Sequence, residues 1–96
     1  MPKNEIKYEN DLYKAILCLE TEEECKRFFD DICTIPEIEA LAQRLEVAKK
    51  LYEGKRYAEV HDLTGVSTAT ICRVSKSLNY GDGGYRTVLE RCAKEG

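Results

Sequence analysis

The segment YAEVHDLTGVSTATICRVSKSL, residues 57–78, constrains the fold most, because it predicts two short helices joined by a tight turn. Gly65 is expected to end the first helix, since glycine adopts the left-handed conformation that closes a helix without strain on a Cβ atom. Ser67 is the expected N-cap of the second helix, where its hydroxyl accepts from free amide groups. No Gly or Pro interrupts the chain from Thr68 to Leu78. This pattern is typical of a helix-turn-helix.

The second helix of this segment has one apolar face and one small, polar and basic face. Ile71, Val74 and Leu78 recur at the spacing of a buried helical stripe. Short outward side chains let such a helix enter the DNA major groove, where arginine pairs with guanine. From the pattern alone, DNA binding and an ordinary helical hairpin are about equally supported. On the DNA-binding hypothesis, the contact residues are Ser67, Thr68, Ala69, Thr70, Cys72, Arg73 and Lys76.

Charge is distributed unevenly along the 96-residue chain, whose net charge is −3. Residues 1–43 carry 5 Lys and Arg against 11 Asp and Glu, a balance of −6, whereas residues 44–96 carry 10 against 7, a balance of +3. This favours a sequence-specific DNA binder over a general nucleic-acid coat, although a solvated mixed-charge surface would show the same distribution. Lys55 and Arg56 would bind DNA phosphates or, equally, stabilise the C-terminus of the preceding helix.

Hydrophobic periodicity predicts helices in the rest of the chain and no β-strand of any length. A first helix is expected over residues 8–19, and a second begins after Thr21, the N-cap of a capping box. A third runs from an N-cap at Thr34 to residue 53, and a last helix follows a short Gly-rich stretch. We therefore expect a single all-α domain of six helices over residues 1–96.

The third predicted helix has an apolar face that is too wide for one neighbour to cover. A chain of this length buries only a modest share of its surface by itself. We therefore expect a second copy of the chain to supply the missing cover, in a homodimer. The apolar positions are Ile38, Leu41, Ala42, Leu45, Val47, Ala48, Leu51 and Tyr52.

The cysteine and histidine content argues against metal and catalytic sites. Five cysteines stand singly, without a CxxC pair, and His61 is the single histidine, so we expect no zinc site, no cofactor and no enzymatic activity. No apolar run is long enough to cross a membrane, and an odd cysteine count without a signal peptide favours the reducing cytoplasm. Four cysteines are expected to be small core residues, namely Cys18, Cys25, Cys33 and Cys92.

Two stretches resemble the sequence pattern of a known protein family, TIPEIEALAQRLEVAKKLYEG at residues 34–54 and GVSTATICRVSKSL at residues 65–78. They resemble the Trp repressor family, including its small Trp-repressor-related bacterial members, and the resemblance extends over about residues 12–92. It implies an intertwined all-α homodimer in which the first three helices and the last form a shared core. The fourth and fifth helices would be heads that bind double-stranded DNA, as in a transcriptional repressor.

In this family tryptophan lies between the core and the second helix of the head, and the resemblance implies an equivalent pocket here. Val74 departs from the pattern, because the repressor has a glycine there that leaves space for the indole. A branched side chain costs about 1–3 kcal/mol of overpacking or excludes the ligand. We therefore expect heads that are held ready for DNA without tryptophan. The alternatives are a regulator with a different small-molecule effector and a protein-interaction module that does not bind DNA. The implied pocket residues are Thr34, Arg44, Thr70, Arg73, Val74 and Ser77.

Overall fold

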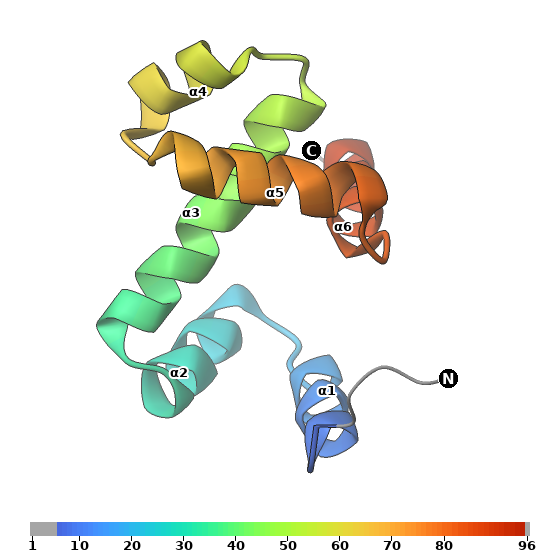
Figure 1. Ribbon diagram of the computed structural model, residues 1–96. Coiled ribbons are helices and arrows are strands. Elements are labelled where there is room, and N and C mark those ends of the chain that lie inside the picture. Colours follow the sequence, from blue (N-terminus) through green and yellow to red (C-terminus); the bar gives the residue numbers. More distant parts are fainter. Residues whose placement is uncertain (1–5, 96) are drawn as a thin grey trace. The chain divides into compact units, whose positions relative to one another are not determined.

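The computed structural model describes residues 6–95, and this range contains six α-helices and no β-strand (Figure 1). The prediction of a six-helix all-α fold is confirmed. The chain divides into two compact units, one ending at Ile38 and one beginning at Glu39. The single-domain prediction also includes residues 1–5 and 96, which lie outside the described range, and it stays a prediction. The helices are α1 (Glu9–Leu17), α2 (Glu22–Ile32), α3 (Ile35–Tyr52), α4 (Tyr57–Thr64), α5 (Thr68–Tyr80) and α6 (Gly84–Glu95).

Side-chain caps set the helix starts in the first unit. The Thr21 hydroxyl accepts the amide of Glu24 at 3.0 Å, which confirms the predicted N-cap of α2. At the start of α3, the amide of Thr34 donates to the Glu37 carboxylate at 2.7 Å, and the amide of Glu37 donates to the Thr34 hydroxyl at 3.3 Å. This reciprocal pair is a capping box, so the predicted N-cap at Thr34 is also confirmed.

Helix α1 is shorter than predicted and ends at Leu17. The amides of Cys18 and Leu19 donate to carbonyls only three residues back, both at 3.1 Å. Bonds of this span tighten the last turn of a helix and stop its regular continuation.

The prediction that four cysteines are core residues is wrong. Cys18 and Cys92 are exposed, and Cys25 and Cys33 are only half-buried. The reason is that no described residue of α1 or α2 is buried, and Cys92 lies on a side of α6 that a single chain leaves open. Apolar periodicity identifies the face that a helix would bury, but it does not say what covers that face.

The core of the second unit lies where α5 crosses α3, with α4 and α6 beside it (Figure 1). The predicted stripe of α5 is buried, since Ile71, Val74 and Leu78 are 0%, 2% and 5% exposed. On α3, by contrast, Leu41 and Leu45 are exposed, and only two residues of its wide apolar face are fully covered. The core residues are Val47, Ala48, Val60, Val66, Ile71, Val74, Leu78 and Leu89.

Helix α5 continues two residues beyond the predicted end at Leu78. Neither Asn79 nor Tyr80 breaks a helix, and α5 ends at Gly81, whose backbone is extended, with φ of −85° and ψ of −156°. No helix within residues 6–95 is long and apolar enough to cross a membrane.

Candidate DNA-binding head and adjoining pocket

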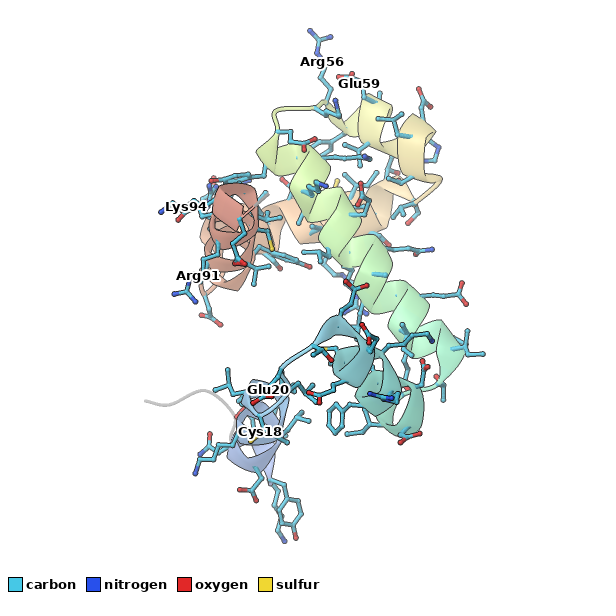
Figure 2. The ribbon with its side chains drawn as sticks, turned by 180° about the vertical axis from the view of Figure 1, so that it is seen from behind. Cys18, Glu20, Arg56, Glu59, Arg91 and Lys94 are labelled. Carbon is cyan, nitrogen blue, oxygen red and sulfur yellow. The ribbon has the colours of Figure 1, made fainter. Side chains whose placement is uncertain are left out.

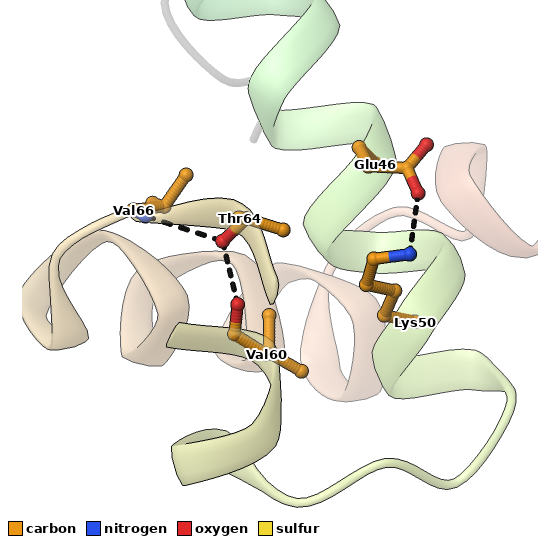
Figure 3. A network of polar contacts seen from close by, with 5 residues as sticks. All are labelled: Glu46, Lys50, Val60, Thr64 and Val66. Carbon is orange, nitrogen blue, oxygen red and sulfur yellow. Dashed lines mark hydrogen bonds and ion pairs between the residues drawn. The ribbon is translucent and has the colours of Figure 1, made fainter. Parts of the chain in front are cut away.

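Local hydrogen bonds define the turn between α4 and α5. Gly65 has φ of 72°, the left-handed conformation predicted for it, and its amide donates to the carbonyl of His61 at 2.8 Å. The Thr64 hydroxyl donates to the carbonyl of Val60 at 2.6 Å and accepts the amide of Val66 at 3.2 Å (Figure 3). His61 Nδ1 lies 2.7 Å from the Val66 carbonyl, so the single histidine is part of the turn. The predicted helix-turn-helix is present.

The start of α5 is fixed by two hydroxyl groups. Ser67 is the N-cap, as predicted, and its Oγ accepts the amide of Thr70 at 3.3 Å. The same hydroxyl donates to Thr70 Oγ1 at 3.1 Å. Both residues were predicted as DNA contacts, and in the free protein their hydroxyls hold the first turn of the helix. Thr68 and Ala69, between them, are exposed.

The outer face of α5 carries positive charge and no negative charge. Thr68, Ala69, Cys72, Arg73 and Lys76 are all exposed, and the sequence of α5 contains no Asp or Glu. Neither the Arg73 nor the Lys76 side chain has a hydrogen bond or ion pair with any residue from 6 to 95. We refer to these five residues as the α5 outer face. Its two cations are available to a partner from outside the chain.

Two further cations precede α4. Arg56 donates its amide to the Glu59 carboxylate at 3.2 Å, and its side chain extends away from the ribbon (Figure 2). Lys55 is half-buried, and its ammonium has no partner among the described residues. Lys50, near the end of α3, donates from Nζ to the Glu46 carboxylate at 2.8 Å (Figure 3). This hydrogen bond raises the pKa of Lys50 and lowers the pKa of Glu46.

A hollow of about 380 Å³ lies between α3, α5 and α6. It brings together five of the six residues predicted for the effector pocket, whereas Thr34 lies in the first unit, where it caps α3. Neither Arg44 nor Arg73 has a hydrogen bond or ion pair within the described chain. The lining contains no Asp or Glu, so the hollow is electropositive. Its lining residues are Ala40, Gln43, Arg44, Thr70, Arg73, Val74, Ser77 and Tyr85.

Sequence reasoning missed Ala40, Gln43 and Tyr85 in this lining. Gln43 adjoins Arg44 in the sequence, but a single polar residue on a long helix carries no signal of its own. Tyr85 is half-buried against the core and also borders the hollow. Val74 belongs to both the core and the lining, so its side chain forms a wall of the hollow. Among residues 6–95, no three His, Cys, Asp or Glu side chains gather as metal ligands would.

Comparison with known proteins identifies the family. Residues 3–93 match the family described as Trp repressor protein. The chain is 56% identical over 80 residues to the uncharacterised protein YerC of Bacillus subtilis (strain 168), a match that covers 83% of this chain and 77% of YerC.

Two solved structures share the fold, each with a TM-score of 0.84. A TrpR-like protein from Eubacterium eligens is 51% identical, with 88% of this chain and 87% of that chain covered. A candidate Trp repressor from Staphylococcus aureus is 44% identical, with 93% of this chain and 96% of that chain covered. The resemblance seen in the sequence is confirmed, and the chain belongs to the Trp repressor family, a family of DNA-binding regulators.

Proposed function

We propose that this protein is a homodimeric, sequence-specific DNA-binding repressor of transcription that tryptophan does not control. The observation that carries the proposal is the α5 outer face, where Arg73 and Lys76 are exposed and unpaired within the described chain. Arginine at such a position can bind guanine through two hydrogen bonds, and lysine can bind a phosphate. The small side chains of Ala69 and Cys72 permit close approach to the bases.

Exposed apolar surface supports the dimer. Leu41 and Leu45 of α3 are 46% and 43% exposed, and Val88 of α6 is 45% exposed. A largely apolar hollow of about 610 Å³ between α3 and α6 includes Leu45, Val88 and Cys92 in its lining. Contiguous apolar surface of this kind marks an interaction site, and a second copy would cover it. Two heads would then meet half-sites about one turn of DNA apart.

Selection from a library of random DNA duplexes tests DNA binding directly. Wild-type protein should enrich a pseudo-palindromic sequence, and Arg73→Ala should lower the affinity for that duplex by about 1–3 kcal/mol. Arg91→Ala is the matched control, because Arg91 is an exposed, unpaired arginine on α6 (Figure 2). An unchanged affinity for the double variant Arg73→Ala, Lys76→Ala would contradict the assignment of α5. Failure to enrich any sequence would instead favour a protein-interaction module.

Light scattering after size-exclusion chromatography tests the dimer. Val88→Lys places a charge in the apolar hollow and should shift the mass from two chains toward one. Glu90→Lys introduces the same side chain at an exposed position outside that hollow and should leave the mass unchanged. A wild-type protein that runs as a monomer at all concentrations would contradict the proposal.

A second candidate function is control by an anionic effector other than tryptophan. The hollow beside Val74 supports it, because two unpaired guanidinium groups, Arg44 and Arg73, border it without a carboxylate. Such a pair suits a carboxylate or phosphate group. Thermal-shift measurements with small carboxylates and phosphates should then show a ligand whose effect disappears in Arg44→Ala. If no compound in the panel raises the melting temperature, the protein acts without this class of effector.

A further inference from the structure

A series of hydrogen bonds links α4, α5 and α6 on the side of α5 opposite the hollow beside Val74, and a cation-π contact extends the series to α3. The Tyr57 hydroxyl, at the start of α4, donates to Ser75 Oγ at 2.5 Å. Asn79 Nδ2 donates to the Ser75 carbonyl at 3.0 Å and to Ser75 Oγ at 3.3 Å. Arg86 of α6 donates from Nη2 to Asn79 Oδ1 at 3.0 Å. Its guanidinium also lies 5.8 Å from the centre of the Tyr52 ring at the end of α3.

Ser75 and Arg86 are placed where their hydrogen bonds can fix the position of α5. Ser75 is 8% exposed and is the one buried polar residue among the described residues, so its hydroxyl depends on protein partners. Arg86 Nε donates to the carbonyl of Leu78 at 3.1 Å, in the last turn of α5. A cation is favourable at a helix C-terminus, where free carbonyl groups carry partial negative charge. Ser75 therefore connects α5 to α4, and Asn79, one helical turn further along, connects α5 to α6.

Apolar packing and hydrogen bonds constrain a helix differently. The hydrophobic effect has no direction, so the aliphatic core of this unit resists separation of the helices more than a small rotation of α5. Hydrogen bonds weaken steeply when their angle changes. A rotation of α5 about its axis would move Ser75 away from Tyr57 and Asn79 away from Arg86 together.

We propose that Tyr57, Ser75, Asn79 and Arg86 form a positioning network that sets the rotation of α5, and with it the direction in which the α5 outer face points. The helix-turn-helix is then held in its DNA-binding orientation by contacts within the chain instead of by a ligand. All four residues lie outside the α5 outer face, and in this inference they act by orienting that face. This inference rests on the proposed DNA-binding function.

The network makes one prediction that a purely stabilising role does not. Tyr57→Phe removes one hydroxyl, and Arg86→Lys keeps the charge but loses the planar guanidinium. Each should weaken binding of the duplex selected by wild-type protein by about two- to tenfold, the usual effect of one hydrogen bond. If the four residues act as a unit, the double variant should lose less than the product of the two single effects.

The measurement is DNA affinity at a temperature where circular dichroism shows each variant fully folded. Under that condition, a role in stability alone leaves the affinity unchanged. Tyr13→Phe is the matched control for Tyr57→Phe, because its hydroxyl bonds to Glu9 at 3.0 Å in α1. Arg91→Lys is the control for Arg86→Lys. Both controls should bind like wild type.

Two outcomes overturn the inference, and they are distinguishable. If wild-type protein binds the selected duplex and both network variants bind it equally well, the network does not position α5, while the proposed function stands. If wild-type protein enriches no duplex, the proposed function and this inference fail together.

Discussion

The amide of Val66 donates a hydrogen bond of 3.2 Å to the hydroxyl of Thr64, across the turn that separates α4 from α5. The same hydroxyl donates to the carbonyl of Val60 at 2.6 Å (Figure 3). The Thr64 hydroxyl thus replaces the backbone carbonyl that would accept the Val66 amide in a regular helix. Because Val66 is only 6% exposed, water cannot easily replace this bond.

Replacing Thr64 with valine should lower the free energy of unfolding by about 1–3 kcal/mol, the cost of leaving a buried amide without a partner. Urea unfolding followed by circular dichroism measures the change. Thr87→Val is the control, since the Thr87 hydroxyl bonds only to the carbonyl of Gly83 at an exposed helix start. Equal losses in the two variants would mean that the turn does not depend on Thr64.

Gly81→Ala should destabilise the protein because the backbone of α5 leaves no space for a side chain there. A Cβ atom on Gly81 would lie 2.4 Å from the carbonyl oxygen of Ser77, and main chain cannot yield as a flexible side chain can. Overpacking of this kind costs about 1–3 kcal/mol. Gly84→Ala, where nothing lies within 4 Å, should be neutral or slightly stabilising in the same thermal unfolding measurement. The opposite order of stabilities would show that the end of α5 adjusts freely.

Lys55→Gln and Arg56→Gln test whether the cations before α4 bind phosphates. Each lost phosphate contact should reduce the slope of log affinity against log salt concentration by about one. Fluorescence anisotropy over a range of salt concentrations measures that slope. Lys94→Gln, at an exposed position of α6, should leave it unchanged (Figure 2). A slope that does not change in either variant would remove these residues from the DNA contact.

Glu37 should make stability depend on pH in the acid range. Hydrogen bonds from the amide and the hydroxyl of Thr34 hold the pKa of the Glu37 carboxyl below its ordinary value of 4.5. A carboxyl with a lowered pKa in the folded state stabilises the fold above its unfolded pKa, and this stabilisation is lost as pH falls through the folded pKa.

Urea unfolding at a series of pH values should therefore show a shallower acid loss in Glu37→Gln than in wild type. Glu39→Gln is the control, because Glu39 is exposed on the same helix and has no hydrogen bond to any described residue. An acid dependence that is identical in Glu37→Gln and wild type would contradict the capping role.

The prediction that tryptophan does not bind rests on the side chain of Val74. Isothermal titration should show no saturable tryptophan binding to wild-type protein. Val74→Gly should lose about 2–4 kcal/mol of stability, because it removes a buried side chain and adds a flexible residue to α5, and it should gain measurable tryptophan binding. Saturable binding by wild-type protein at micromolar tryptophan would contradict the prediction.

Features that depend on neighbours in the sequence were predictable from the sequence. The N-caps at Thr21, Thr34 and Ser67, and the left-handed Gly65, each need only a side chain or a glycine within four residues of the groups it satisfies. Five residues of the predicted effector pocket also line one hollow, because the family resemblance supplied contacts that spacing alone does not.

The sequence by itself determined six helices, their caps, the buried stripe of α5 and the turn at Gly65, because these features rest on hydrogen bonds and periodicity within one element. Only the tertiary structure decided that Cys18 and Cys92 are exposed, and that Tyr85 borders the hollow beside Val74. It also brought together Tyr57, Ser75, Asn79 and Arg86, which come from three different helices. The physical reason is that burial and long-range hydrogen bonds depend on which helix faces which, and no local pattern specifies that.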